Sequence, residues 1–417
     1  MKILVDENIP LARELFGTLG DVTLVKGRDV DADYPGLEEY AVLAIRSVTD
    51  ITPELVDRAR NCRVIGTATI GTDHIDDAYI RKVNPEREVP ITVFSAPGSN
   101  ADSVADYVWF CFCRVADLHD LDLSGCSLGI VGYGNCGSRV ARRAAGFGMD
   151  VLRNDPPLAE REPAFSSDTL EDTLRADFVT MHVPLTHEGE SAHPTHHMMG
   201  KEEFARMRSD AFFINSSRGA AVDSAALIAT LEAGDIAGAV LDVFEGEPEP
   251  PEALISLPDI ATPHIAGYAV EAKRRGAVVI YEKTCETLGV EPTDTAALLS
   301  GDFDPPAGLV VPFDDGGPTE QAADRAVRRL LQAIYDVTET SRELKETLGS
   351  RERGKLFDAM RKNYRRDYNR HELAMYRVGL APELPELLRE AIERRLRGFG
   401  VTVAAEQAHY VLEAGQP

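Results

Sequence analysis

The sequence predicts an α/β protein with two doubly wound parallel-sheet domains and a smaller α+β domain at the C-terminal end. Up to about residue 260, short apolar runs alternate with helix-like stretches, a pattern typical of parallel sheets. A glycine-rich turn follows one of these runs, and segments rich in Pro, Gly and Asp interrupt the pattern after residue 300. The 417 residues exceed what one hydrophobic core usually organises, so we expect two or three domains.

The first domain is predicted from three apolar runs, at residues 2–5, 42–45 and 64–67, which have the length and composition of strands. Helix-like stretches at residues 10–19 and 53–60 lie between these runs. Since parallel strands need a crossover connection, the alternation of strand and helix indicates a parallel sheet. A long apolar helix is then expected at 100–118.

The next strand, at residues 127–131, leads into a dinucleotide-binding pattern. Gly132, Gly134 and Gly137 form a GxGxxG sequence, and a helix-like stretch follows at 138–145. The three glycines permit a tight turn, a close approach of the backbone to a pyrophosphate, and close packing of helix on strand. Because the glycines lie between a strand and a helix, the pattern predicts a bound dinucleotide.

An acidic residue at the end of the following strand indicates which dinucleotide binds. The strand at 150–154 ends at Asp155, eighteen residues after Gly137 (155 − 137). A carboxylate at this place accepts hydrogen bonds from the ribose 2′-hydroxyl and repels a 2′-phosphate. The sequence therefore favours NAD over NADP. Arg153 could instead face a phosphate, but its place before Asp155 favours a packing or solvated role.

Arg218, Glu247 and His264 together have the chemistry needed to oxidise a 2-hydroxy acid. A guanidinium holds an α-carboxylate through two parallel hydrogen bonds. An imidazole accepts the hydroxyl proton as the hydride leaves, and a paired carboxylate orients that imidazole and stabilises its charged form. Each residue follows an apolar run, at 211–215, 239–242 and 259–262, and ligands of doubly wound sheets bind at the carboxyl ends of strands.

The glycine fingerprint and the motifs NSSRGAAVD, LDVFEGEP and PHIAGY, in this order, resemble those of the D-2-hydroxyacid dehydrogenases. Other segments resemble the branch of that family that oxidises 4-phospho-D-erythronate. They are MKILVDENIP at the N-terminus, RSVT at 46–49, GTATIGTDH at 66–74, SAPGSNADSVADY at 95–107 and LFDAMRKNYRRDYNRHE at 356–372. The resemblance covers nearly the whole chain.

The resemblance implies three domains. Residues 1–98 and 266–300 would form a discontinuous, flavodoxin-like substrate domain, into which a helix at 267–288 returns. Residues 99–265 would form an NAD-binding Rossmann domain. Residues 301–417 would form an α+β dimerisation domain, so that the protein is expected to be a homodimer.

The resemblance also implies an activity and a set of site residues. The reaction would be NAD-dependent oxidation of 4-phospho-D-erythronate, a small phosphorylated 2-hydroxy acid, in pyridoxal 5′-phosphate (vitamin B6) biosynthesis. Arg218, Glu247 and His264 fall on the catalytic positions of the family, with His264 as proton donor. Further positions are implied for binding the substrate at Ser47, Thr69 and Tyr268, and for binding the cofactor at Asp155, Ser216, Ser217, Asp242 and Gly267. Arg46 adds a positive charge for an anionic substrate.

Two alternatives remain open. The protein could act on another 2-hydroxy acid, such as D-3-phosphoglycerate, although the FDAMRKNY and DENIP segments favour the phosphorylated erythronate. It could also be a non-catalytic NAD-sensing protein, a reading that Arg218, Glu247 and His264 disfavour. Formate oxidation is disfavoured because that reaction needs no acid–base pair.

Charge and composition exclude several classes of partner. The net charge of −25 and the pI of about 4.8 argue against nucleic acid or a membrane surface, which would repel the chain. No run of eighteen apolar residues occurs, and the six Cys form no CxxC pattern, so we expect a soluble cytoplasmic protein. The excess of acidic residues and the scarcity of Lys suggest a salt-rich host cytoplasm.

Two further clusters of charged or titratable residues stand out in the sequence. Arg361, Lys362, Arg365 and Arg366 have helical spacing and could approach the substrate phosphate, or they could form a solvated helix face. Five histidines lie between positions 182 and 197, and the segment 187–199, which contains all of them except His182, matches no family pattern. Its spacing fits no zinc motif, and hydride transfer to nicotinamide needs no metal, so the sequence predicts no metal site.

Overall fold

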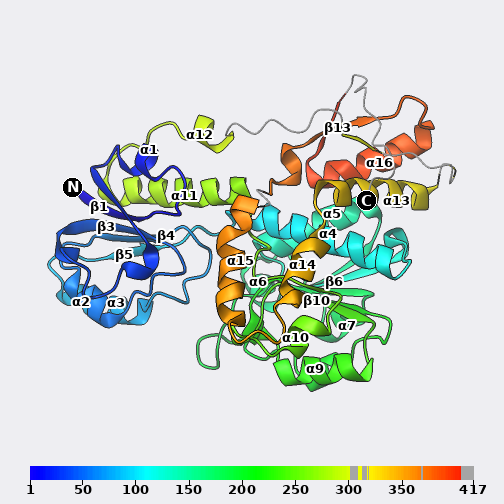
Figure 1. Cartoon of the computed structure of the whole chain (residues 1–417), viewed down its shortest axis with the longest axis horizontal. Coiled ribbons are helices and arrows are strands. Elements are labelled where there is room, and N and C mark those ends of the chain that lie inside the picture. The colour runs from blue at the N-terminus through cyan, green and yellow to red at the C-terminus, as the bar shows by residue number, and fades with distance from the viewer. Residues whose placement is uncertain (301–308, 312–316, 318, 368–369, 405–417) are drawn as a thin grey trace. The chain divides into compact units, whose positions relative to one another are not determined.

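The computed structural model describes residues 1–300, 309–311, 317, 319–367 and 370–404 (Figure 1). The chain divides into two compact units. Unit 1 consists of Met1–Asn100 and Ala269–Phe303, and unit 2 of Ala101–Tyr268 and Asp304–Pro417. None of the helices within the described ranges is long and apolar enough to cross a membrane.

Unit 1 is built on a five-stranded parallel sheet with the strand order β2-β1-β3-β4-β5. Its strands are β1 (Lys2–Asp6), β2 (Asp21–Val25), β3 (Tyr40–Ile45), β4 (Val64–Thr67) and β5 (Thr92–Phe94). Its α-helices are α1 (Ala12–Phe16), α2 (Pro53–Arg58), α3 (Asp77–Val83), α11 (Val270–Leu288) and α12 (Ala296–Ser300). The three predicted strands are confirmed, whereas the helix predicted at 10–19 is shorter: it begins after Leu11, which has a left-handed backbone (φ = 59°), and ends at Phe16 before Gly17.

Two separate cores lie on the two faces of this sheet. One face contacts α1 and α11 through residues such as Val42, Phe16 and Ile280. The other face contacts α2 and α3 through residues such as Leu43 and Leu55. Burial on both faces explains why the strands are continuous apolar runs instead of alternating ones.

Unit 2 contains a six-stranded parallel sheet with the order β11-β10-β9-β8-β6-β7. Its strands are β6 (Ser127–Val131), β7 (Asp150–Asn154), β8 (Phe178–Met181), β9 (Phe212–Asn215), β10 (Gly238–Leu241) and β11 (Ile260–Ala261). One face packs on α4 (Ala101–Leu118) and α5 (Asn135–Phe147), in the core that contains Trp109. The other face packs on α7 (Leu170–Leu174), α8 (Lys201–Phe204), α9 (Ser224–Ala233) and α10 (Ala253–Ser256). The predicted α/β fold with parallel sheets is therefore confirmed.

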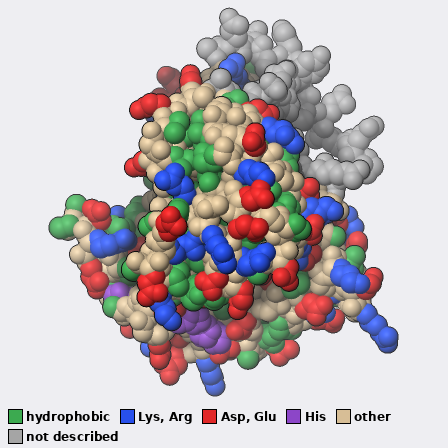
Figure 2. Space-filling model, turned by 90° about the vertical axis from the view of Figure 1, so that its left-hand side faces the viewer, with side chains coloured by type: hydrophobic (Ala, Val, Ile, Leu, Met, Phe, Trp, Pro, Cys, Tyr) green, Lys and Arg blue, Asp and Glu red, His purple; other side chains and the backbone are tan. Residues whose placement is uncertain are grey.

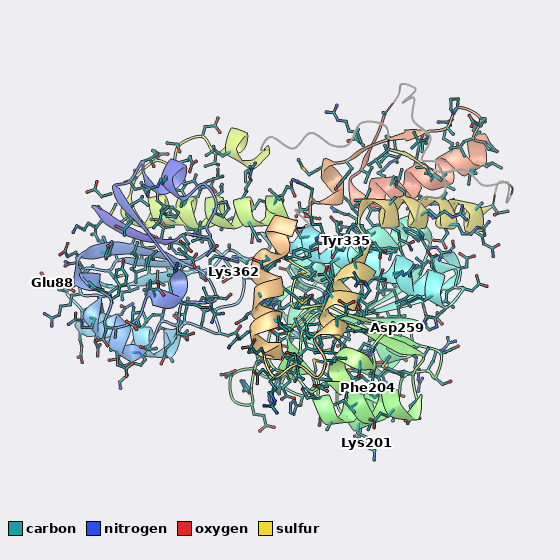
Figure 3. The ribbon with its side chains drawn as sticks, viewed as in Figure 1. Glu88, Lys201, Phe204, Asp259, Tyr335 and Lys362 are labelled. Atoms are coloured by element: carbon teal, nitrogen blue, oxygen red, sulfur yellow. The ribbon has the colours of Figure 1, made fainter. Side chains whose placement is uncertain are left out.

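The C-terminal part of the chain packs on this second sheet domain and forms one compact unit with it. It contributes α13 (Glu320–Ile334), α14 (Val337–Glu346), α15 (Arg353–Asp367) and α16 (Glu386–Phe399). A small parallel sheet, β12-β13-β14, consists of Val310–Val311, Arg377–Leu380 and Thr402–Val403. Tyr335, labelled in Figure 3, follows α13 and is 8% exposed. The assignment of 301–417 as a dimerisation domain stays a prediction, and residues 405–417 lie outside the described residues.

Candidate active site

The turn between β6 and α5 has the geometry that a dinucleotide pyrophosphate requires. Gly132 has φ = 92°, and a Cβ there would lie 2.6 Å from the carbonyl oxygen of His182. A Cβ on Gly137 would lie 2.1 Å from the carbonyl oxygen of Gly132, so only glycine permits this approach of helix to turn. At Gly134, by contrast, a Cβ would meet nothing within 4 Å. The turn is therefore packed tightly on its inner side and open at Gly134, beside the N-terminus of α5.

Asp155 lies beside this turn because β7 is the parallel neighbour of β6. Its Oδ2 accepts a hydrogen bond from the backbone N–H of Tyr133 at 2.8 Å, and its Oδ1 caps the next helix, α6 (Pro156–Arg161), through Leu158 N–H at 2.9 Å. A carboxylate has about four acceptor positions, so ribose hydroxyls can still bind it. The guanidinium of Arg153 lies over the rings of Tyr133 and Phe165, 5.4 Å from each centroid, which supports its packing role.

The NSSR motif forms a turn after β9 that Asn215 organises. The side-chain oxygen of Asn215 accepts from the N–H and the hydroxyl of Ser217, at 3.0 and 2.8 Å, and its amide donates to the carbonyl oxygen of Arg218 at 3.0 Å. The neighbouring Ser216 has a buried hydroxyl with no hydrogen-bond partner among the described residues. Buried hydroxyls normally have a hydrogen-bond partner, and a polar group of a bound cofactor would supply one here. The turn is therefore suited to binding a cofactor.

Gly219 brings the NSSR turn against the LDVFEGEP loop. A Cβ on Gly219 would lie 1.9 Å from the carbonyl carbon of Phe244, so any side chain at this position would force the two segments apart. Because β9 and β10 are parallel neighbours, both segments leave the same edge of the sheet. The predicted residues Arg218 and Glu247 therefore belong to adjacent loops.

His264 and Glu247 form a hydrogen-bonded pair. The Nδ1 of His264 lies 2.8 Å from Glu247 Oε2, and Glu247 Oε1 accepts from the N–H of Phe244 at 2.9 Å. Burial alone would raise the pKa of Glu247, but the charge of His264 and its hydrogen bond, the Phe244 N–H and the charge of Arg361 lower that pKa below its usual value. The carboxylate thus holds a proton on Nδ1, which leaves Nε2 available for acid–base chemistry.

Asp242 shapes the turn that carries His264. His264 has a left-handed backbone (φ = 55°), and its N–H donates to the carbonyl oxygen of Asp242 at 2.7 Å. The buried carboxylate of Asp242 accepts from the hydroxyl of Thr262 at 2.7 Å and from the N–H groups of Ile265 and Ala266 at 2.8 and 2.9 Å. Burial raises the pKa of Asp242 despite the nearby charge of His264 and these hydrogen bonds.

Arg370 fastens the loop that continues from His264 to Gly267 and Tyr268. This buried guanidinium donates to the carbonyl oxygens of Ala266 and Tyr268, and to that of Ser103 on α4 at 3.2 Å. The loop is thereby tied to α4 by a residue of the C-terminal part of the chain. No local pattern in the sequence indicated this role, because the partners lie between 102 and 267 residues from Arg370 along the chain.

One face of α15 packs against the loops that carry Glu247 and Tyr268. A Cβ on Gly354 would meet the side chain of Glu249, the ring of Phe357 contacts that of Phe244, and the rings of Tyr364 and Tyr268 lie 6.2 Å apart. These positions, 354, 357 and 364, together with 361, share one helix face. The contacts therefore place position 361 beside the His264–Glu247 pair.

Arg361 brings a positive charge to this face. Burial alone would lower the pKa of Arg361, but Tyr268, Glu247 and Asp242 raise it. Its Nε is buried and has no hydrogen-bond partner among the described residues. The side chains of Arg365 and Arg366, the other arginines of the predicted cluster, lie outside the described residues.

The remaining candidates belong to unit 1. Arg46 and Ser47 directly follow β3, and Thr69 follows β4, which is the parallel neighbour of β3. Ser47 is exposed, and the Thr69 hydroxyl lies 2.6 Å from that of Thr67. The three residues therefore share the carboxyl edge of the unit 1 sheet, while the His264–Glu247 pair and the glycine turn belong to unit 2.

The parallel sheets, the glycine turn with its acidic partner and the His264–Glu247 pair define a class of protein, the NAD-dependent dehydrogenases of 2-hydroxy acids. Comparison with known proteins agrees: residues 101–266 match the family model described as D-isomer specific 2-hydroxyacid dehydrogenase, NAD binding domain. The chain is 40% identical over 369 residues to the erythronate-4-phosphate dehydrogenase of Aeromonas salmonicida, covering 87% of this chain and 92% of that protein. It is 39% identical to that of Salinibacter ruber, covering 95% and 99%.

Among solved structures, the TT0316 protein from Thermus thermophilus is similar with a TM-score of 0.58 and 31% identity, covering 70% of this chain and 99% of that one. The chain therefore belongs to the erythronate-4-phosphate dehydrogenase family, within the D-isomer specific 2-hydroxyacid dehydrogenases. It is an oxidoreductase whose cofactor is NAD.

Proposed function

We propose that the protein oxidises 4-phospho-D-erythronate to (R)-3-hydroxy-2-oxo-4-phosphobutanoate, a step in the biosynthesis of pyridoxal 5′-phosphate. The observation that carries the proposal is the 2.8 Å pair of His264 Nδ1 and Glu247 Oε2, which supplies a base for a hydroxyl proton. The names of the relatives that match over nearly their whole length support this choice of substrate.

In the proposed reaction, His264 Nε2 accepts the proton of the C2 hydroxyl while the C2 hydrogen leaves as hydride, so that the C2–O bond becomes a carbonyl. NAD, when bound, supplies the hydride acceptor. Glu247 stabilises the imidazolium that forms, and in the reverse reaction His264 returns the proton to the C2 oxygen. Arg218 is proposed to bind the substrate carboxylate and to polarise the C2 oxygen.

The cofactor would be held by residues of unit 2. Gly132, Gly134 and Gly137 would admit the pyrophosphate at the N-terminus of α5, and Asp155 would bind the ribose. Ser216, Ser217, Asp242 and Gly267 are proposed to line the rest of the cofactor site; the unpartnered hydroxyl of Ser216 supports a polar contact there. Arg46, Ser47, Thr69 and Tyr268 are proposed to bind the substrate.

Arg361 is proposed to bind an anionic group of the substrate, the 4-phosphate. Its support is the placement of position 361 beside Glu247 and Tyr268, with a buried Nε that lacks a partner among the described residues. We expect Arg361→Met to raise KM for 4-phospho-D-erythronate at least tenfold, and Arg361→Lys to raise it less. Lys362→Met is the matched control, because Lys362 is exposed on the same helix (Figure 3). Equal KM values for Arg361→Met and Lys362→Met would contradict this role.

The protein is further proposed to be a cytoplasmic homodimer formed through residues 301–417. The support is that a similar solved structure is matched over 99% of its own length by only 70% of this chain, so that fold is complete without the remainder. Light scattering on the full chain tests the assembly: a dimer has twice the 45.5 kDa of one chain. A mass of one chain at micromolar concentration would contradict it.

The experiment that tests the activity compares NADH formation with 4-phospho-D-erythronate, D-3-phosphoglycerate and D-lactate, each with and without a 2-oxo acid acceptor. We expect kcat/KM for the first to be at least about a hundredfold higher, which corresponds to roughly 2.7 kcal/mol of transition-state binding. Equal rates would indicate a general 2-hydroxy acid dehydrogenase. Binding of NAD without turnover of any substrate would indicate the NAD-sensing alternative.

A further inference from the structure

The histidine-rich segment after β8 is held in place by contacts at both of its ends. Thr186 and Thr195 bond to each other through backbone and side chain, with Thr186 N–H donating to Thr195 Oγ1 at 2.9 Å. His197 N–H then donates to the carbonyl oxygen of Ala220 at 2.9 Å, and Met199 bridges to Val222. The histidines therefore lie on an anchored loop that packs on the segment after the NSSR turn.

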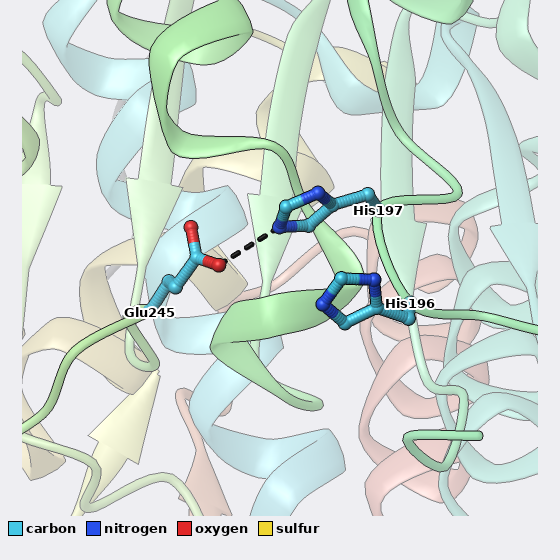
Figure 4. Close-up of side chains that lie close together, drawn as sticks. All are labelled: His196, His197 and Glu245. Carbon is cyan, nitrogen blue, oxygen red and sulfur yellow. Dashed lines mark hydrogen bonds and ion pairs between the residues drawn. The ribbon is translucent and has the colours of Figure 1, made fainter. Parts of the chain in front are cut away.

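Two of these histidines meet an acidic residue of another loop. The rings of His196 and His197 stack with centroids 4.0 Å apart and planes 22° apart. His197 Nε2 lies 2.8 Å from Oε1 of Glu245, which comes from the LDVFEGEP loop after β10. One ligand atom from each of the three residues can be chosen so that all lie within 4.8 Å of one another. Figure 4 shows both imidazoles presenting a nitrogen toward the carboxylate.

The spacing of these atoms is close to that of a tetrahedral metal site. With zinc–nitrogen and zinc–oxygen bonds of about 2.0–2.2 Å, the ligand atoms of a tetrahedral site lie roughly 3.3 Å apart. The His197–Glu245 pair, at 2.8 Å, is slightly closer than this, and the widest separation, which is within 4.8 Å, needs a contraction of at most about 1.5 Å. The side chains of His197 and Glu245 are 37% and 36% exposed, so they have room to adjust.

The surroundings also fit a metal ligand set. Ser224 Oγ donates to the second carboxylate oxygen of Glu245 at 2.9 Å, and such a hydrogen bond orients a ligating carboxylate. Two imidazoles and one carboxylate suit zinc and similar divalent ions, and the exposure of the cluster leaves a fourth position for water. The chain's net charge of −25 raises the local concentration of cations.

We propose that His196, His197 and Glu245 bind one divalent transition-metal ion with the chemistry of zinc. The ion ties the histidine loop to the loop that carries Glu247, which is separated from Glu245 only by Gly246. Its role is structural, and it is independent of the substrate proposed above. The sequence predicted no metal site because the third ligand comes 48 residues after His197, on a different loop.

The test is a zinc titration of the full chain, free of any added histidine tag and stripped of metal by a chelator, followed by calorimetry. We expect one zinc ion per chain to bind with micromolar or tighter affinity, and to raise the melting temperature. His197→Gln and Glu245→Gln should weaken zinc binding at least tenfold. His193→Gln is the matched control: His193 lies on the same loop but pairs with Glu160 at 2.8 Å, outside the cluster.

A variant that fails to fold is recognised by its metal-free circular dichroism, and His196→Gln then replaces it as the second ligand variant. Replacing zinc by cobalt adds a spectroscopic readout, because a tetrahedral cobalt site absorbs strongly in the visible range and the ligand variants should lose that band. Absence of zinc binding by the unaltered chain would overturn the proposal. So would zinc binding by His197→Gln and Glu245→Gln that equals that of His193→Gln.

Discussion

His264 adopts a left-handed backbone conformation that residues other than glycine rarely take (φ = 55°). It is held there by the carbonyl oxygen and the buried carboxylate of Asp242, which together bond to three consecutive backbone N–H groups and to Thr262. Asp242 is therefore a positioning residue for the imidazole, in addition to any contact that it makes with the cofactor. The strained backbone conformation of His264 is thus stabilised by Asp242, whose hydrogen-bond acceptors are almost fully used.

Replacing His264 by Gln should lower kcat by about 10²- to 10⁴-fold, because the hydroxyl proton then has no base. The affinity for NAD should be unchanged, since the glycine turn and Asp155 are untouched. Stopped-flow measurement of NADH formation, together with a fluorescence titration of NADH binding, checks both expectations. A variant that keeps more than a tenth of the original kcat would exclude His264 as the base.

Glu247 should make stability depend on pH in a defined direction. Burial would raise the pKa of Glu247 in the folded protein, but its partners, first among them the charge of His264, lower that pKa below its usual value. The contribution of Glu247 to the free energy of unfolding is therefore fully present above the unfolded pKa of about 4.3. It is lost as the pH falls through the lowered folded pKa. The difference in melting temperature between the protein and Glu247→Gln should therefore shrink as the pH falls from 6 to 3. A difference that stays constant or grows toward low pH contradicts the assigned pKa shift.

At the scale of elements, the C-terminal helix α16 packs closely on α5 of the nucleotide-binding sheet domain. A Cβ on Gly146 of α5 would lie 3.1 Å from the carbonyl oxygen of Arg394 and from the Cα of Arg395. Gly398 of α16 faces Arg143 in the same way, with a Cβ distance of 3.3 Å. A glycine on each helix thus permits the close approach, and Trp109, Phe147 and Phe399 form an aromatic cluster beside it.

Gly146→Val should destabilise the protein by about 1–3 kcal/mol, because the added methyl groups force the two helices apart. The comparison is Gly125→Ala, where a Cβ meets nothing within 4 Å and little change is expected. Chemical denaturation with urea, followed by circular dichroism, gives both values. If the two variants lost the same amount of stability, the cost would lie in helix or backbone propensity instead of in the packing of α16 on α5.

At the scale of the whole molecule, the charge is strongly unbalanced. The chain carries 69 acidic and 44 basic residues, and acidic side chains are spread over the visible face among lysines and arginines instead of forming one patch (Figure 2). Repulsion among so many like charges opposes folding, and added salt screens it over a Debye length of about 10 Å at 0.1 M and 3 Å at 1 M.

The melting temperature should therefore rise as sodium chloride is increased from low to molar concentration. Activity should also rise from low to molar salt if the acidic composition is an adaptation to a salt-rich cytoplasm. Calorimetric scans across this range, with initial rates measured in the same buffers, test both statements. A melting temperature and an activity that do not respond to salt would exclude the adaptation.

The sequence by itself determined the parallel α/β architecture, the glycine turn with Asp155, and the identity of the His264–Glu247 pair. These features are local: each depends on a short motif at the carboxyl end of a strand, and parallel strands bring such ends to one edge of a sheet. Only the tertiary structure decided which distant segments meet. Three contacts depend on how helices and loops pack, and no spacing in the chain encodes them. They are the contact of Arg370 with the loop after His264, the placement of Arg361 beside Glu247, and the placement of Glu245 beside the histidine loop.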